Sequence, residues 1–173
     1  MVFLVIPNAI YCRNGHFNGF APEQNTSLRY KGVFHEWQER ELREKLVRLA
    51  FCPRCGVDNI NGCLHCETII DDDIEHRSER PSYCCACGKP FPWTEAALAT
   101  AREYTDELEQ LNAEDNAALK ATFPDLTVET ARTGLAASRF KKLIAKVAPA
   151  AGDVLRKILV DVATEAAKRA MGG

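Results

Sequence analysis

The sequence predicts an α+β protein in two parts, and three observations carry this prediction. All eight cysteines lie in the N-terminal half, most of them in Cys-x-x-Cys pairs. That half is poor in apolar clusters, so side-chain burial alone would leave it marginally stable. In the C-terminal half, apolar residues recur at helical spacing. We therefore expect short β-hairpins stabilised by metal over residues 1–92, followed by an α-helical domain over residues 93–173.

The overall composition excludes a strong electrostatic field. The 173 residues include 22 basic and 24 acidic side chains, for a formal net charge of −2. This balance does not steer the chain toward nucleic acid or anionic lipid. The N-terminal run from Met1 to Pro7 lacks the basic start of a signal peptide, and we expect a cytoplasmic protein. In a reducing compartment, Cys-x-x-Cys pairs are typical of metal ligands rather than disulfides.

The first residues predict one or two strands that lead into a candidate ligand turn. Short apolar runs occupy Val2–Ile6 and Ala9–Tyr11. Cys12-Arg-Asn-Gly-His16 follows as a variant metal knuckle in which histidine is the second ligand. In the standard Cys-x-x-Cys-Gly form, a tight turn directs backbone N–H groups at the thiolates and the glycine adopts a positive φ.

A helix is expected over residues 35–50. Leu42, Leu46 and Leu49 recur there at i, i+4 and i+7, and charges of alternating sign surround them. The segment lies between candidate ligands, so this helix would be an insertion into the metal-binding domain.

The central segment contains three Cys-x-x-Cys pairs. They are Cys52/Cys55, Cys63/Cys66 and Cys84/Cys87, and a glycine follows the first and the last pair. Together with Cys12 and His16 these cysteines make eight ligands, which suffices for two tetrahedral Zn²⁺ sites. Cys85 lies inside the third turn and is expected not to ligate.

Composition leaves two ways of pairing the ligands. Sequential pairing makes tandem zinc ribbons, with Cys12, His16, Cys52 and Cys55 in one site and the remaining pairs in the other. Cross-brace pairing alternates the pairs between the sites. The long connection over residues 56–62 favours the sequential arrangement. An iron–sulfur cluster is an alternative, although the histidine and the glycine-terminated knuckles favour zinc.

The C-terminal half predicts a bundle of three to four helices. Thr94 is expected as the N-cap of the first, with Glu95 in its first turn and an end near Leu111. Others are expected over residues 114–122, from about residue 127 to 147, and from Pro149 onward. The apolar stripe of the last helix comprises Leu155, Ile158, Leu159, Val162, Ala166 and Ala170.

Charge is distributed unevenly within this half. Residues 94–128 contain eight acidic and two basic side chains, whereas residues 129–173 contain four acidic and nine basic ones. Opposed charge suits a bundle whose halves attract each other, or a basic surface that binds an anionic partner. The candidate contacts to an anion or nucleic acid are Arg132, Arg139, Lys142, Lys146, Arg156 and Lys157.

These motifs resemble an uncharacterised bacterial family of small zinc-ribbon proteins with a helical C-terminal half. The knuckles carry the resemblance, above all Tyr83-Cys84-x-x-Cys87-Gly-Lys-Pro-Phe-Pro-Trp93-Thr-Glu95. It extends to Thr130–Thr133, Ala137–Lys142 and Asp161–Lys168. The resemblance implies bound zinc and the two-part architecture. It implies no activity, because the family is of unknown function.

The sequence favours a non-enzymatic adaptor or regulatory protein, in which zinc ribbons present a helical domain for oligomerisation or for docking on a protein partner. Nucleic-acid binding through the basic helices over 129–170 is the alternative, and a cross-braced ubiquitin-ligase-like module is a weaker one. We lean against an enzyme because the ligand count closes both sites to substrate. A membrane partner is not expected, because Asp161 and Glu165 dilute the basic face of the last helix.

Overall fold

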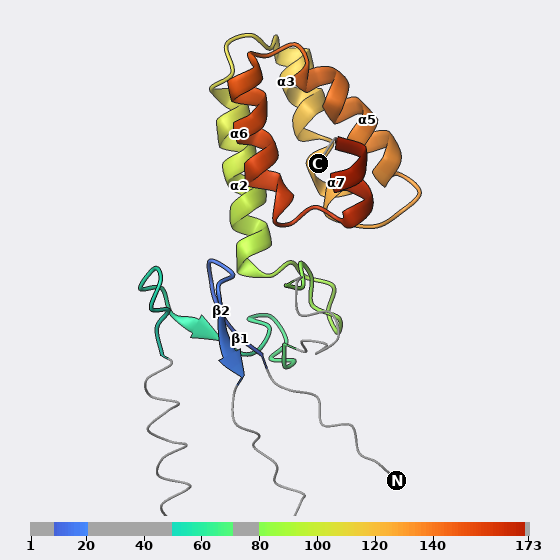
Figure 1. Ribbon diagram of the computed structural model, residues 1–173. Coiled ribbons are helices and arrows are strands. Elements are labelled where there is room, and N and C mark those ends of the chain that lie inside the picture. Colours follow the sequence, from blue (N-terminus) through green and yellow to red (C-terminus); the bar gives the residue numbers. More distant parts are fainter. Residues whose placement is uncertain (1–8, 21–49, 71–79, 172–173) are drawn as a thin grey trace, which may run out of the picture. The chain divides into compact units, whose positions relative to one another are not determined.

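The computed structural model describes residues 9–20, 50–70 and 80–171 of the chain. The chain divides into two compact units, Met1–Pro92 and Trp93–Gly173. The fold is α+β, with a small antiparallel sheet in the first unit and helices in the second (Figure 1). The strand predicted over Val2–Ile6 lies outside the described residues, as does the helix predicted over 35–50 apart from Ala50.

The sheet of the first unit has three strands in the order β2-β1-β3. They are β1 (Ala9–Cys12), β2 (Phe17–Phe20) and β3 (Asn59–Ile60), and β1 pairs antiparallel with both neighbours. All residues of β1 are buried, which suits the continuous apolar run of a central strand. The strand predicted over Ala9–Tyr11 is therefore confirmed.

Among the described residues of the first unit, few large apolar side chains are buried. A backbone bond from the N–H of Ala9 to the carbonyl of Ile70, 3.0 Å long, connects the segment after Cys63 and Cys66 to the sheet. The large buried residues, besides the cysteines, are Ile10, Tyr11, Ile60, Ile70 and Phe91.

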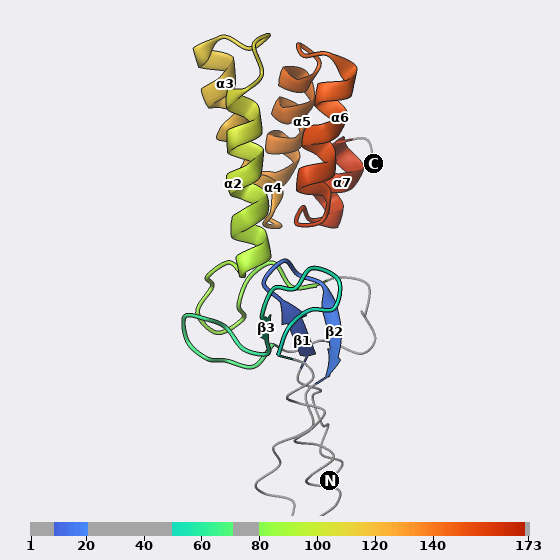
Figure 2. The ribbon, with the colours of Figure 1, turned by 90° about the vertical axis from the view of Figure 1, so that its left-hand side faces the viewer.

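The second unit is built around α5, which packs against α3, α4 and α7 (Figure 2). Its interior contains Phe123 and Phe140, both fully buried, with ring centroids 6.4 Å apart. No helix among the described residues is both long and apolar enough to cross a membrane. The helices are α2 (Pro92–Asp106), α3 (Ala113–Lys120), α4 (Phe123–Leu126), α5 (Thr133–Ile144), α6 (Pro149–Val160) and α7 (Glu165–Met171).

The predicted start of the first helix was wrong. Thr94 is not the N-cap, because α2 begins at Pro92 and Thr94 lies fully buried within the helix. Proline suits a first helical position, since it has no N–H to leave unpaired. Glu95 lies in the first turn as predicted. The helix ends at Asp106 rather than near Leu111. Leu108 and Leu111 lie in the turn that follows, and their side chains are buried.

The structure contains more and shorter helices than predicted, because a turn interrupts the last expected helix and the short helix α4 follows α3. The helix expected from about residue 127 to 147 is α5 and spans only Thr133–Ile144. The last helix breaks between α6 and α7, where the hydroxyl of Thr164 accepts a hydrogen bond from the N–H of Ala167 at 3.2 Å. This break shifts the helical phase. Ala167 and Met171 are therefore buried in place of Ala166 and Ala170.

Candidate metal centres

The three Cys-x-x-Cys segments adopt one backbone conformation. In each, the N–H of the first cysteine donates to the carbonyl of the residue five positions later. The N–H of the residue four positions later donates to the carbonyl of that cysteine. The bonds from Cys52, Cys63 and Cys84 are each 2.8 Å long. A single β-bridge closes each turn, the first between Phe51 and Asp58. The sequence thus repeats one knuckle three times.

The residue after the second cysteine adopts a positive φ in all three knuckles. Gly56 has φ 71° and Gly88 has φ 69°, and the equivalent residue of the middle knuckle is Glu67 with φ 60°. Glutamate is strained in this conformation because its Cβ approaches the carbonyl oxygen. Alignment of the three segments in the sequence would have revealed this departure.

The hydrogen-bonded turn that begins at Cys12 is one residue shorter than the turns of the three Cys-x-x-Cys segments. The N–H of Gly15 donates to the carbonyl of Cys12 at 2.7 Å, and the N–H of Cys12 donates to the carbonyl of His16 at 3.0 Å. Gly15 has φ 79°, and a Cβ at this position would clash with the guanidinium of Arg80. That guanidinium donates to the carbonyl of Gly15 at 3.2 Å, which ties the segment before the third knuckle to the first.

The sheet places the first two knuckles side by side. Cys12 ends β1 and is paired with Asn59, the first residue of β3, which follows the knuckle of Cys52 and Cys55. An ion pair between Arg13 and Asp58, 2.8 Å long, joins the two turns. Strand pairing therefore brings together ligands that are some forty residues apart in the sequence.

The eight predicted ligands form two groups, and within each group all ligand atoms lie within 4.8 Å of one another. Cys12, His16, Cys52 and Cys55 make the first group, which is the sequential arrangement rather than the cross-brace. The second group comprises Cys63, Cys66, Cys84 and Cys87. Cys85 is exposed and belongs to neither group.

The spacing within the groups fits one tetrahedral ion. A Zn–S bond of about 2.3 Å and a Zn–N bond of about 2.0 Å place two sulfurs about 3.8 Å apart, and sulfur and nitrogen about 3.5 Å apart. In the first group Cys12 Sγ lies 3.7 Å from Cys55 Sγ, and His16 Nδ1 lies 3.5 Å from Cys12 Sγ and 3.6 Å from Cys52 Sγ.

The second group has the same spacing. Cys63 Sγ lies 3.7 Å from Cys87 Sγ, and Cys66 Sγ lies 3.6 Å from Cys84 Sγ. Each pair in contact joins one buried cysteine to one exposed cysteine of the other knuckle. The two knuckles therefore face each other across a space of the size that a single ion requires.

Hydrogen bonds prepare some of these thiols for ionisation. Burial opposes ionisation of Cys52, but the N–H groups of Arg54 and Cys55 lower its pKa to about 6. The hydroxyl and N–H of Thr68 lower the pKa of Cys66 to about 6. Backbone N–H groups are common donors to metal-bound thiolates, and such bonds orient and tune the ligands.

Crowding has the opposite effect on other thiols. Burial raises the pKa of Cys12. The N–H of Lys89 favours the thiolate of Cys87, but burial and the three neighbouring sulfurs outweigh it and raise its pKa to about 12. Several thiolates at this separation repel each other, and a divalent cation at the centre removes that repulsion.

Two residues that support the ligands were not predicted from the sequence. The side-chain oxygen of Asn18 accepts a hydrogen bond from the Cys52 thiol at 3.6 Å, and its N–H donates to the side-chain oxygen of Asn59 at 2.7 Å. Thr68 lies 3.3 Å from Cys66 Sγ through its hydroxyl. Thr68 follows Cys66 by two residues, and this short spacing is the only feature of the sequence that could have indicated its contact with the ligand. Nothing in the sequence places Asn18 beside Cys52, because strand pairing brings them together.

Half of the predicted anion contacts form ion pairs within the helical unit. Arg132 bonds Asp125 at 3.0 Å and Lys146 bonds Asp115 at 2.7 Å, both between the acidic and the basic part of the unit. Arg156 bonds Asp153 at 2.8 Å on the same helix. Arg139, Lys142 and Lys157 form no ion pair with any described residue. The attraction expected between the two halves is thus present.

Comparison with known proteins places the chain in a family. Residues 8–171 match the model of the family described as "Uncharacterized protein conserved in bacteria (DUF2321)". No curated protein and no solved structure matches the chain. The match covers nearly the whole chain and includes all eight candidate ligands. The chain therefore belongs to this conserved bacterial family.

Proposed function

We propose that the chain is a non-enzymatic zinc-binding protein, in which two Zn²⁺ ions hold tandem ribbons together and the helical unit docks on protein. The observation that carries the zinc assignment is the spacing of the ligand atoms. Distances of 3.5–3.7 Å between them match a tetrahedral ion bonded to sulfur and nitrogen.

The same spacing weighs against a multi-iron cluster. In such a cluster the cysteines bond different irons. Cysteine sulfurs on opposite sides of the cluster are therefore farther apart than sulfurs bonded to one ion. Here all ligand atoms of a group lie within 4.8 Å of one another. Histidine in the first group adds support for zinc, which accepts mixed sulfur and nitrogen ligands.

Four protein ligands per ion support a structural role. A closed tetrahedral site has no position left for water or substrate, so the ion would stabilise the fold rather than polarise a reactant. Structural zinc contributes on the order of 10–16 kcal/mol of apparent binding energy, which is comparable with the net stability of a typical domain. The first unit would therefore depend on its metal to fold.

The ion pairs of the helical unit favour protein docking over nucleic-acid binding. Arg132, Lys146 and Arg156 are already paired with carboxylates. A phosphate backbone would have to displace these carboxylates or accept their repulsion. A gel shift at low salt tests this alternative, and a salt-dependent shift would favour nucleic acid over docking on protein.

Elemental analysis of the protein purified under reducing conditions tests the zinc assignment. We expect two zinc ions per chain, one for each ligand group. Cys63→Ser should lose one ion. Cys85→Ser is the matched control and should retain both, because it changes a neighbouring cysteine that belongs to neither group. A chain that takes up no zinc in competition with a chromophoric chelator would refute the assignment.

A further inference from the structure

Unpaired charges of both signs occur near one end of the helical unit. Glu107, Glu109 and Glu114 are exposed around the α2–α3 turn and form no ion pair with a described residue. Arg139, Lys141 and Lys142 are likewise exposed and unpaired along the second half of α5. We name these sets the acidic flank and the basic flank.

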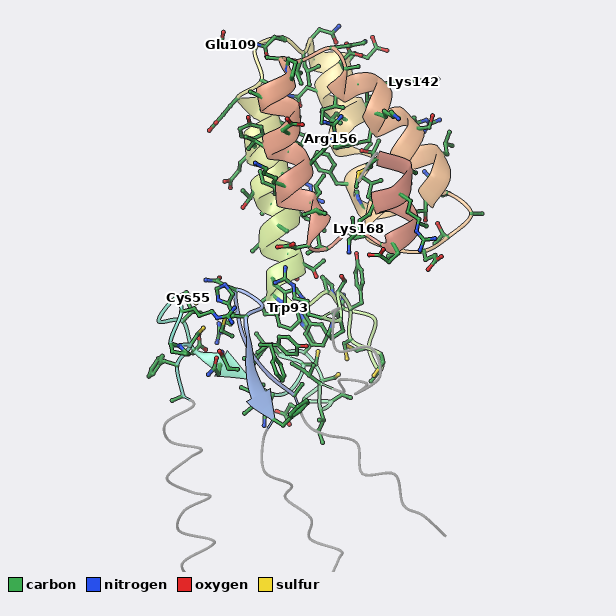
Figure 3. All side chains as sticks on the ribbon, viewed as in Figure 1. Cys55, Trp93, Glu109, Lys142, Arg156 and Lys168 are labelled. Atoms are coloured by element: carbon green, nitrogen blue, oxygen red, sulfur yellow. The ribbon has the colours of Figure 1, made fainter. Side chains whose placement is uncertain are left out.

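The two flanks lie on opposite sides of the same end of the unit. Figure 3 shows Glu109 and Lys142 at this end, on either side of the helices. The ion pair between Lys146 and Asp115, 2.7 Å long, holds the end of α5 beside the start of α3. This juxtaposition is a consequence of the tertiary fold, because the flanks come from different helices.

Small apolar side chains are exposed beside the basic flank, around Lys146, whose charge is already paired with Asp115. The α5–α6 turn exposes Ala145 and Ala148, and the start of α6 exposes Pro149 and Ala150. No acidic side chain occurs from residue 130 to residue 152, so nothing within this stretch neutralises its basic residues. Side chains this small leave room for a second surface to approach, so that charged groups on the flanks can reach those of a partner.

We propose that this end of the helical unit binds a second copy of the chain. A surface with one acidic and one basic flank is complementary to itself when a two-fold axis passes between the flanks. Each acidic flank then meets the basic flank of the other copy, and the apolar turns meet near the axis. The inference rests on the docking role of the proposed function, since it names the partner.

Self-association fits these charges better than an extended anionic partner. A nucleic acid that contacted Arg139 and Lys142 would pair only with the basic flank and would leave the acidic flank without a partner. A second copy contributes both signs of charge in the same arrangement. The chain therefore carries its own complement at this surface.

Sedimentation velocity of the full zinc-loaded chain tests this inference. We expect a dimer that forms with rising concentration at 0.1 M salt and dissociates at 1 M salt, where the screening length falls from about 10 Å to about 3 Å. Reversal of two acidic charges, Glu107→Lys with Glu109→Lys, should weaken association at least tenfold. Reversal of two basic charges, Lys141→Glu with Lys142→Glu, should have the same effect.

An equal mixture of the two reversed variants distinguishes this interface from a general effect of charge. Each variant alone places like charges together, whereas a mixed dimer restores both complementary contacts, and its affinity should return to within about twofold of the original. Matched controls with the same net charge, Glu95→Lys with Glu129→Lys and Lys157→Glu with Arg169→Glu, should leave dimerisation nearly unchanged. Glu95 lies about 16 Å along α2 from Asp106, the residue before the acidic flank, and is therefore beyond the screening length.

Two results would overturn the inference. One is a wild-type chain that stays monomeric up to roughly 1 mM at low salt. The other is a mixture of reversed variants that does not associate although circular dichroism shows both to be folded. Zinc content is measured on the same samples, so a monomer with two zinc ions would overturn this interface alone and leave the zinc assignment intact.

Discussion

Glu67 provides the sharpest test of the knuckle geometry. It occupies the position of Gly56 and Gly88 in the other two knuckles and has φ 60°. Its side chain is exposed. Glu67→Gly should therefore relieve backbone strain while removing little packing.

The expected gain follows from two opposing contributions. A residue with a Cβ in the left-handed region costs about 1–2 kcal/mol, which glycine avoids. Glycine also raises the conformational entropy of the unfolded chain, which costs about 0.4–1 kcal/mol. The net stabilisation is about 0.5–1 kcal/mol. Because folding of this unit is expected to be coupled to metal binding, the gain appears as a two- to fivefold higher zinc affinity.

Competition with a chromophoric chelator at fixed pH measures this change. Glu67→Ala is the matched control, since it removes the same carboxylate but keeps the strained Cβ, and its affinity should stay near that of the wild type. The reverse substitution, Gly88→Ala, has open space around the new Cβ and should weaken binding through strain alone. A Glu67→Gly chain that binds zinc no more tightly than Glu67→Ala would refute the strain argument.

Three further outcomes follow from the metal centres and the helical core. Removal of metal by a chelator should unfold the first unit and leave the helical circular dichroism largely intact, because the second unit contains none of the ligands; loss of all helix would contradict this. Zinc affinity should fall at least tenfold per pH unit below neutrality, because binding displaces the proton that Cys87 holds through its pKa of about 12. The fall should steepen below about pH 6, where Cys52 and Cys66 also gain protons, and an affinity independent of pH would argue against thiolate ligands. Phe140→Ala should destabilise the helical unit by about 3–5 kcal/mol in denaturant unfolding, whereas the exposed Leu135→Ala should cost under about 0.5 kcal/mol.

Local chemistry explains why the candidate ligands could be predicted. A Cys-x-x-Cys turn is complete within six residues, so its ligands and its glycine can be recognised without knowledge of the fold. The amphipathic helices were predictable for the same reason, because their apolar period is local. Helix ends were predicted less well. The break after α6 depends on the carbonyl of Leu126, which accepts a 3.0 Å bond from the N–H of Thr164 across the unit.

The sequence by itself determined the eight candidate ligands and identified Cys85 as the cysteine outside both groups. It also determined that the first part of the helical half is mainly acidic and the second part mainly basic. The tertiary structure decided between the two ways of grouping the candidate ligands, of which the sequence had only favoured the sequential one, since pairing of β1 with β3 brings Cys12 beside Cys52. It also decided which charges are neutralised, as with Lys146 and Asp115, and which remain free at the end of the unit. Both decisions concern residues far apart in the sequence, and only chain packing sets the distances between such residues.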